Sequence, residues 1–231
     1  MIVPPGTGPL AGLGAALPSR AWKEILACGI MRRYRAGTVL LRQDAPGSYV
    51  LALTEGRVMV TRTGASGEEL IMALGDAGEV LGDMTVLDEA PRSATVTALT
   101  PCTVHVMSSE HFRALIHRHG AADTVARHAF ARLREAERAR FEMNTLPVTQ
   151  RVARALVRLT ATPSVDSIGL SQEQLARLVG ASRNAVVDAL VRLRGQGIIS
   201  TSRRHLVICK PAALRALAME NTPRPGDARA V

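Results

Sequence analysis

The sequence predicts an α+β protein in which a β-rich part, a long helix and a small helical domain follow one another. Three observations predict this order. Short apolar runs alternate with turn residues from Tyr34 to about Met107, an unbroken helical pattern covers 121–145, and short helices closed by glycines follow Pro147. The chain has 231 residues, of which 47% are hydrophobic, and this is ample for two modest cores.

The β-rich part is expected because its apolar residues alternate with a period close to two, as in half-buried strands. The runs are TVLLRQ, SYVLALTEGRVMVTRT, EELIMAL, ATVTAL and TVHVMS. Glycines fall between or at the ends of these runs, at spacings suited to the hairpins of a compact barrel or jelly roll: Gly37, Gly47, Gly56, Gly64, Gly67, Gly75, Gly78 and Gly82. A short helix capped by Ser19 is expected before the runs, and SSEHFRALIHRHG predicts another after them.

The long helix is predicted from about Ala121 to Thr145, because this segment contains neither proline nor glycine. One stripe recurs along it at steps of three and four residues: Val125, Ala129, Leu133, Ala136, Arg140 and Met143. So narrow a stripe on so long a helix resembles the seam of a coiled coil and predicts a homodimer. The pattern leaves open that the helix packs against its own barrel.

The last domain begins at Pro147, which disfavours helix at Leu146 and suits the first turn of a new helix that reaches about Ala161. We expect the domain to extend to residue 220. The segment Asn144 to Pro147 is then the expected hinge between the long helix and this domain.

Two further helices in this domain are the most informative feature of the chain. Ser171 and Gln174 predict a capping box before a short helix, and Gly180 supplies the turn that follows. Ser182 caps a second helix, which has an apolar face and ends near Gly195. Two helices joined by a short turn containing glycine are typical of a helix-turn-helix, and IISTSRRHLVIC adds a two-stranded wing.

The charge distribution points to a polyanionic partner. Residues 1–120 contain 11 basic and 11 acidic residues, so the net charge of +9 lies entirely in 121–231. Residues 147–210 alone contain 10 basic and 3 acidic residues, an excess of seven positive charges that is available to DNA phosphates. Together with the helix-turn-helix, this predicts binding to double-stranded DNA.

Several other classes of protein are disfavoured. Cys28, Cys102 and Cys209 stand singly and are expected to be buried thiols, which argues against a disulfide framework or a zinc site. No run approaches the length of a membrane span and no secretory leader is present, so a cytoplasmic protein is expected. No catalytic motif is present, which argues against an enzyme. His117, His119 and His128 are expected to be solvated, although they leave open a metal site at the start of the long helix.

Three segments together resemble the Crp/Fnr family of bacterial transcription regulators: GTVLLRQ with EGRVMV, LGDMTVLDEAPRSATVTAL, and LSQEQLARLVGASRNAVVDALVRLRGQGIIS. The resemblance covers residues 20 to about 218. It implies a cyclic-nucleotide-binding β-roll over 1–120, a dimerisation helix with a hinge over 121–146, and a winged helix-turn-helix over 147–220. The tail over 221–231 is expected to be disordered, as is the segment 1–15. The resemblance also implies RNA polymerase as a partner.

The resemblance implies an effector site in the second segment. Arg92 would pair with a cyclic phosphate, Gly82 would allow close approach of the backbone, and Ser93 and Ala94 would offer amide groups. Asp83 stands where the family has a glutamate, one methylene longer. On the long helix, Ala136 and Glu137 occupy the positions that contact adenine in cyclic-AMP-responsive members, and neither reproduces those contacts; Glu137 is kept as a candidate contact.

These departures weigh against selective binding of cyclic AMP. Three alternatives stay open: cyclic AMP, another nucleotide or anionic effector, and a site that binds nothing. In the third case the chain is a ligand-independent regulator whose β-roll only supports dimerisation. A surface arginine beside a hairpin is the alternative for Arg92.

The second helix of the helix-turn-helix is expected to enter the major groove. Asn184 and Asp188 lie opposite its apolar face, and Arg183 lies at its N-terminal end. Arg183, Asn184 and Asp188 would read guanine, adenine and cytosine respectively. Asp188 has the alternative of pairing with Arg192 four residues later. The other expected DNA contacts are Ser171, Gln172, Ser182, Arg203 and Arg204.

Overall fold

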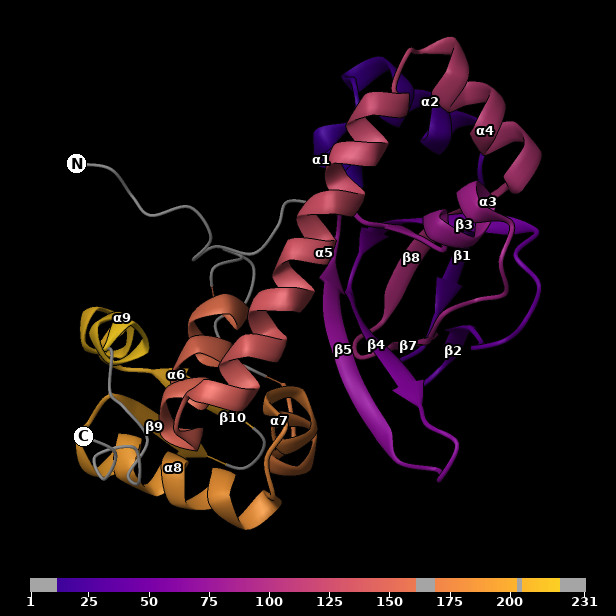
Figure 1. The fold of residues 1–231 in the computed structure, drawn as a ribbon. Helices are drawn as coiled ribbons and strands as arrows, with labels where there is room; N and C mark the ends of the chain where they lie inside the picture. Colours follow the sequence, from indigo (N-terminus) through magenta and orange to yellow (C-terminus); the bar gives the residue numbers. More distant parts are fainter. Residues whose placement is uncertain (1–11, 161–168, 203–204, 221–231) are drawn as a thin grey trace, which may run out of the picture. The chain divides into compact units, whose positions relative to one another are not determined.

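The computed structural model describes residues 12–160, 169–202 and 205–220 (Figure 1). Its contacts divide the chain into two compact units, of which the first ends at Leu133 and the second begins at Arg134. The division falls within the long helix α5 (Ala122–Thr145), whose bounds agree with the prediction to within one residue. Each unit is described by itself.

The first unit is a β-roll made of two antiparallel sheets of four strands each. One sheet has the order β1-β8-β3-β6 and the other β2-β7-β4-β5. The strands are β1 (Ile30–Tyr34), β2 (Val39–Leu41), β3 (Tyr49–Glu55), β4 (Arg57–Thr63), β5 (Glu69–Asp76), β6 (Val80–Leu81), β7 (Thr95–Ala98) and β8 (Cys102–Ser108). The expected jelly-roll architecture is therefore present.

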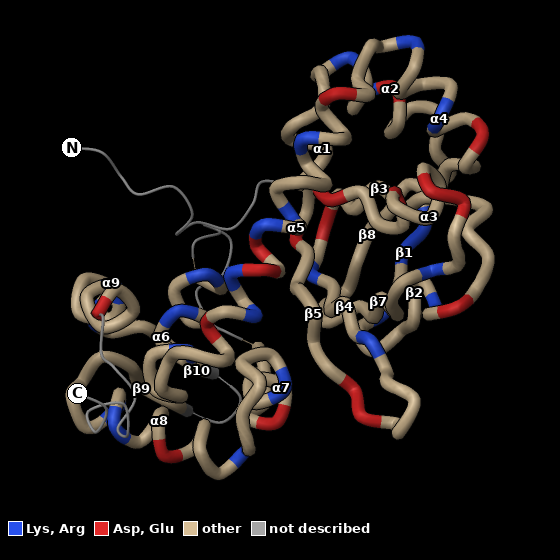
Figure 2. The backbone as a smooth tube through the Cα atoms, viewed as in Figure 1, with Lys and Arg blue, Asp and Glu red and all other residues tan. Residues whose placement is uncertain are grey.

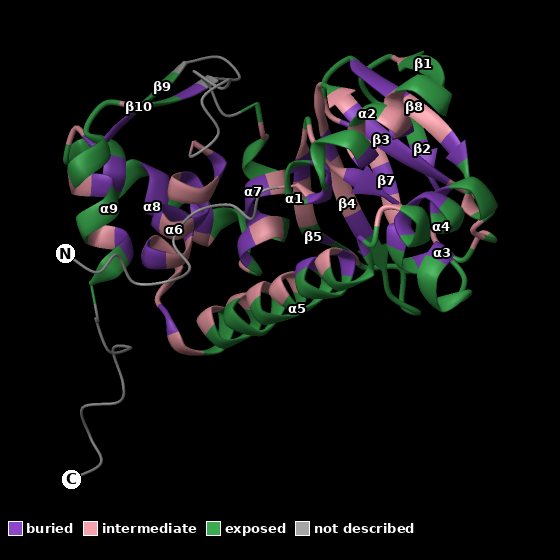
Figure 3. Ribbon diagram, turned by 90° about the horizontal axis from the view of Figure 1, so that it is seen from above, coloured by how far each residue is buried: buried purple, intermediate pink, exposed green. Residues whose placement is uncertain are grey.

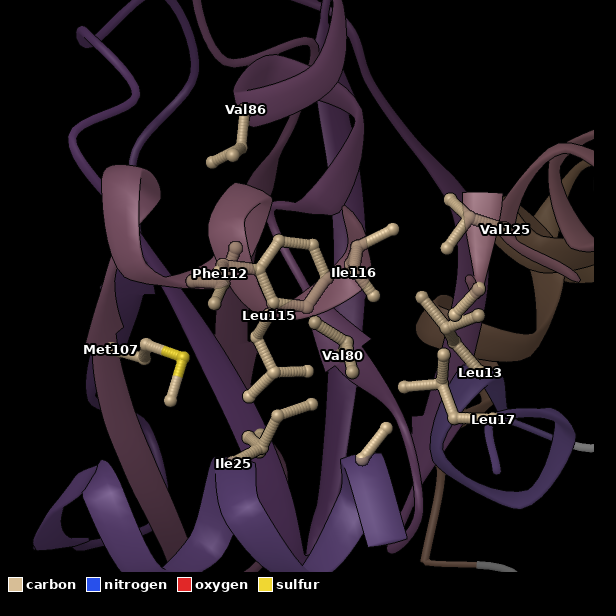
Figure 4. Packing of buried hydrophobic residues seen from close by; sticks show 14 residues of the cluster. Leu13, Leu17, Ile25, Val80, Val86, Met107, Phe112, Leu115, Ile116 and Val125 are labelled. Atoms are coloured by element: carbon tan, nitrogen blue, oxygen red, sulfur yellow. The ribbon is translucent and has the colours of Figure 1, made fainter. Parts of the chain in front are cut away.

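Four short helices and the start of α5 complete the first unit: α1 (Leu13–Ala16), α2 (Ser19–Cys28), α3 (Asp83–Asp88) and α4 (Ser109–Arg118). Figure 4 shows their apolar side chains gathered around Phe112, which is fully buried. Val125 of α5 belongs to this same cluster and fixes the beginning of the long helix to the roll. A second cluster, which includes Leu51, Leu53 and Val58, supplies further packing within the roll.

The structure departs from the sequence prediction at the start of the roll. The predicted loose segment 1–15 is ordered at its end, because Leu13 is fully buried in α1; residues 1–11 lie outside the described residues. Pro18 is the N-cap of α2, and Ser19 is its first helical residue. The edge strand β1 was not predicted, because four of its five residues are exposed and the apolar alternation is lost.

In its described residues, the second unit contains four helices beyond α5 and a two-stranded wing. Its elements beyond α5 are α6 (Val148–Leu159), α7 (Gln172–Val179), α8 (Arg183–Gly195), β9 (Ile199–Ser202), β10 (His205–Ile208) and α9 (Pro211–Met219). The predicted capping box is formed, since Ser171 accepts from the Gln174 amide and the Gln174 side chain accepts from the Ser171 amide. Gly180 ends α7 with φ +60°, a left-handed conformation that favours glycine and turns the chain toward α8.

The thiols do not all behave as predicted. Cys102 is buried, but Cys28 and Cys209 are exposed, because Cys28 is the last residue of α2 and Cys209 follows the wing. Within the described residues, no helix has both the length and the apolar character needed to cross a membrane. The predicted disordered tail over 221–231 lies outside the described residues.

Candidate effector site and nucleic-acid interface

The candidate effector site, here called the cassette, comprises Gly82, Asp83, Arg92, Ser93 and Ala94 around helix α3. Gly82 follows β6 with φ +82° and is the N-cap of α3, so Asp83 is the first helical residue. A side chain at Gly82 would collide with the Arg92 guanidinium. The glycine is therefore required both by its own backbone conformation and by its neighbour.

Arg92 is not the surface residue that was considered as an alternative, because only 3% of it is exposed. Its Nη1 donates to the Gly82 carbonyl oxygen over 2.9 Å, and its Nη2 donates to the Tyr49 carbonyl oxygen. The guanidinium also stacks over the Tyr49 ring, 5.1 Å from the centroid. Burial lowers the pKa of Arg92 from its ordinary value. The cation is thus held inside the roll by neutral acceptors.

The backbone at and after Arg92 contains both paired and unpaired amide groups. Arg92 itself exchanges both of its backbone hydrogen bonds with Asp44 and Ala45, each over 2.9 Å. In the described part of the chain, the next two amides, of Ser93 and Ala94, donate to no protein group. Two free adjacent N–H groups beside a guanidinium form an arrangement that suits an anion.

Two residues near Arg92 have a strained backbone conformation. Asp44 and Glu89 are the only non-glycine residues with positive φ among those described, at 64° and 58°. Glu89 ends α3, and its carboxylate pairs with Arg113 over 2.8 Å. Non-glycine residues adopt this conformation at a cost and are concentrated at functional sites.

Asp83 is buried and paired with the long helix. Its carboxylate lies 3.7 Å from Nη1 of Arg132 on α5, and 8% of its side chain is exposed. Glu79, which precedes β6, belongs to the same group of charges: burial raises its pKa, and the nearby Arg132 opposes that change. Asp83 therefore connects the cassette to α5 within the first unit.

His128 is the one buried polar residue of α5, with 7% of its surface exposed. Its Nε2 is buried and has no hydrogen-bond partner among the described residues. Burial is the main cause that lowers the pKa of His128, the positive charge of Arg132 lowers it further, and Asp83 opposes both. The expectation that this histidine is solvated is therefore wrong.

The three histidines considered as a metal site are not brought together as one. His117 is exposed, and His119 Nε2 lies 2.7 Å from a Glu24 carboxylate oxygen. No group of three or more potential metal ligands occurs in the described parts of the chain.

Sequence reasoning missed Tyr49, Glu79, His128 and Arg132 as neighbours of the cassette. One signal was present, because Val125, His128 and Arg132 recur at steps of three and four residues and so share a face of α5. Glu137, the remaining candidate contact, is exposed on α5 and belongs to the second unit.

The candidate nucleic-acid interface is formed by the exposed side of α8 and the beginning of α7. Ser182 is the N-cap of α8 and accepts from the Ala185 amide over 3.2 Å. Val186, Leu190 and Leu193 are buried, as expected. Asn184 and Asp188 are exposed on the opposite face of α8, and Arg183 is exposed at its first residue. Ser171 and Gln172 are exposed at the beginning of α7.

Figure 2 marks basic positions toward both ends of α8 and an acidic one between them. Among the described residues, no ion pair joins Asp188 to Arg192, so the alternative role for Asp188 lacks support. The wing residues Arg203 and Arg204 lie outside the described residues.

The arginines of α6 show that not all of the positive charge in 147–210 is available to DNA. Arg151 donates to the carbonyl oxygens of Val179 and Gly180 over 2.8 and 2.9 Å. Arg154 and Arg158 both pair with the Glu142 carboxylate of α5, over 2.8 and 3.2 Å. These three arginines are therefore engaged within the protein, because acceptors from α5 and α7 face them. So are Arg177, which pairs with Glu173, Arg194, which donates to Thr201, and Lys210, which donates to the Gln196 carbonyl oxygen.

Comparison with known proteins agrees with this architecture. Residues 31–119 match the family described as "Cyclic nucleotide-binding domain", and residues 150–217 match "Crp-like helix-turn-helix domain". The cyclic AMP receptor protein of Thermus thermophilus is 30% identical over 195 residues, which cover 81% of this chain and 87% of that protein.

Two solved structures share the fold. The c-di-GMP-responsive global regulator CLP of Xanthomonas campestris gives a TM-score of 0.70 at 23% identity and covers 83% of this chain and 99% of its own. FixK2 of Bradyrhizobium japonicum gives a TM-score of 0.69 at 22% identity and covers 84% of this chain and 99% of its own.

A roll of the cyclic-nucleotide-binding type joined to a Crp-like helix-turn-helix defines a DNA-binding transcription regulator. The chain belongs to the Crp/Fnr family of these regulators, as its sequence predicted.

Proposed function

We propose that this regulator is controlled by an anionic effector that binds at the cassette. The observation that supports the proposal is the buried Arg92 guanidinium beside the free amides of Ser93 and Ala94. A phosphate oxygen is a stronger acceptor for an arginine than a neutral carbonyl oxygen. An effector phosphate would therefore replace the Gly82 and Tyr49 carbonyls as the partner of Arg92.

The effector is not restricted to cyclic AMP in this proposal. Asp83, the candidate partner of a ribose hydroxyl, is held by Arg132, and an effector must compete with that ion pair. We therefore place cyclic AMP alongside other nucleotides with a phosphodiester.

A ligand-independent regulator is the second candidate, and it too has support. Both charged groups of the cassette already have partners within the protein. Arg92 donates to two carbonyl oxygens, and Asp83 forms an ion pair with Arg132. In that case the roll supports dimerisation alone. Calorimetric titration of the intact protein with cyclic AMP, cyclic GMP and cyclic di-GMP separates the candidates, because only a sensor releases or absorbs heat that Arg92→Ala abolishes.

The proposed assembly is a homodimer with α5 at its seam. Figure 3 shows that α5 is exposed or half-buried over most of its length. Phe130, Leu133 and Phe141 are 60%, 55% and 67% exposed on this helix, and large apolar side chains in such a state mark an interaction surface. Sedimentation at micromolar concentration should give a dimer, and Leu133→Asp should give a monomer.

We further propose that two copies of α8 read half-sites about one DNA turn apart, as twofold symmetry requires. Arg183, Asn184 and Asp188 are the proposed base contacts, and Ser171, Gln172 and Ser182 the proposed phosphate contacts. RNA polymerase stays a predicted partner. The chain is proposed to act by binding and not by catalysis, in keeping with its relatives.

A further inference from the structure

We propose that His128 is an additional effector-binding residue, which donates a hydrogen bond from Nε2 to an anionic oxygen of the bound nucleotide and takes up a proton as the nucleotide binds. The inference rests on the effector site proposed above. Nothing in the family resemblance or in the comparisons assigns a role to this residue.

The imidazole of His128 has an unsatisfied nitrogen. A buried polar nitrogen without a partner is rare in folded proteins, because it has lost its water and gained nothing in return. Only 7% of His128 is exposed, and its Nε2 has no hydrogen bond in the described part of the chain. The nitrogen is therefore unpaired but covered in the free protein, so an effector that contacts it must displace the atoms that cover it.

His128 lies on the same face of α5 as a residue that contacts the cassette. Val125 packs in the core of the roll, and His128 and Arg132 follow it at i+3 and i+7 on the same face. Arg132 reaches Asp83 of the cassette over 3.7 Å. His128 thus lies on the face of α5 that contacts the effector site, and the charges of both Arg132 and Asp83 act on its imidazole.

Charges of both signs surround this histidine. Arg132 from α5 and Asp83 from α3 are the charged groups that act on it, and Glu79 and Arg92 join the cluster through those two residues. In the free protein, burial and Arg132 keep His128 neutral at neutral pH, since they hold its pKa below the ordinary value. An added phosphodiester charge favours the imidazolium, so binding should take up a proton.

The test is calorimetric titration of the intact protein with cyclic AMP, cyclic GMP and cyclic di-GMP, at about pH 6 and about pH 8 and in buffers of different ionisation enthalpy. The wild type should bind at least one of these nucleotides about tenfold more tightly at the lower pH, and the heat should report proton uptake.

Three variants separate a binding role from a structural one. His128→Leu should bind about tenfold or more weakly, without pH dependence, although its thermal stability without nucleotide is equal to or above that of the wild type, because an unsatisfied buried nitrogen is removed. His128→Gln can donate a hydrogen bond but cannot take up a proton, so it should bind near the wild-type level at the higher pH and lose the pH dependence. His117→Gln, an exposed change on α4, is the control and should retain both properties.

Two outcomes overturn the inference in distinguishable ways. If the wild type binds a nucleotide and His128→Leu binds it equally well at both pH values, the role of His128 is refuted and the effector site stands. If the wild type binds none of the three nucleotides, the effector site and the role of His128 both fail.

Discussion

The arginines of α6 and two of those of α8 belong to the same domain and to the same basic stretch of sequence, yet they are in opposite states. Arg151, Arg154 and Arg158 of α6 are bound to carbonyl and carboxylate oxygens of the protein itself. Arg183 and Arg192 of α8 are exposed and have no ion pair among the described residues.

The difference shows that net charge overstates what a domain offers to DNA. An arginine that is paired with Glu142 stabilises the junction of α5 and α6, and releasing it to a phosphate would leave a carboxylate without its partner. Only the arginines whose acceptors are absent from the fold are available to a duplex. The arginines of α6 therefore stabilise the fold, and Arg183 and Arg192 of α8 are left exposed for the proposed contacts with DNA.

The largest effect should follow removal of Arg183. Arg183→Ala loses the proposed bidentate contact to guanine together with a positive charge at the groove, so specific affinity should fall by about 100-fold or more. Fluorescence anisotropy with a site recovered by in vitro selection measures the loss. Arg215→Ala, which removes an exposed arginine from α9 outside the helix-turn-helix, is the matched control. Equal affinity of the two variants would remove α8 from the interface.

A change of preference, and not of affinity alone, is expected for Asp188. Asp188→Ala removes an acceptor for a cytosine amino group, and discrimination at one base pair should weaken by about 1–3 kcal/mol. In vitro selection with the variant should therefore recover sites that are degenerate at one position of each half-site. Recovery of the wild-type site at wild-type affinity would show that Asp188 contacts no base.

On the structural side of the comparison, Glu142→Gln should destabilise the second unit. The change leaves Arg154 and Arg158 without their carboxylate, and because these arginines are 30% and 32% exposed, water compensates in part. We expect a loss of about 1–2 kcal/mol, below the cost of breaking a fully buried pair. Urea denaturation followed by circular dichroism measures it, and Glu137→Gln on the exposed face of α5 should leave the midpoint unchanged.

A smaller effect is expected in the salt dependence of DNA binding, which should differ between arginines of α8 and α6. Arg192→Ala should reduce the slope of log affinity against log salt concentration by about one, since each phosphate contact contributes about that amount. Arg158→Ala should leave the slope unchanged, because that arginine is bound to Glu142. A reduced slope for Arg158→Ala would show that the α5–α6 ion pairs open when DNA binds.

The histidines of the first unit differ in burial, since His128 is buried and His117 is exposed, and this difference gives the smallest effect. The folded-state pKa of His128 lies below the unfolded value, so the unfolded chain binds the extra proton when the pH falls below about 6.5. Stability is therefore complete above that pH and decreases below it, by at most about 1.4 kcal/mol per pH unit.

Thermal melts of the wild type and of His128→Leu between about pH 5 and about pH 8 test this sign. The variant should lose this part of the pH dependence, and His117→Gln should keep it. A wild-type protein that becomes more stable on acidification through this range would contradict the assignment.

The fold was predictable because its signals are local. Alternation in the strand runs, the helix without glycine or proline, and the capping box at Ser171 and Gln174 each act over a few residues. The elements that were missed are those without such signals. Strand β1 is mostly exposed, and α3 is only six residues long.

The site was predictable in part. The cassette residues were recognised from a motif, and the exposure of Asn184 and Asp188 follows from the helical period. The partners of the cassette were not, because Tyr49 precedes Arg92 by 43 residues and Arg132 comes from a different helix. No pattern of neighbouring residues reports such contacts.

The sequence by itself determined the order of the domains, the bounds of the long helix and the face that α8 presents, since periodicity and capping are properties of a few consecutive residues. Only the tertiary structure decided which charges are free. The acceptors that bind Arg92, Arg154 and Arg158 come from other elements, and folding alone brings them within hydrogen-bonding distance.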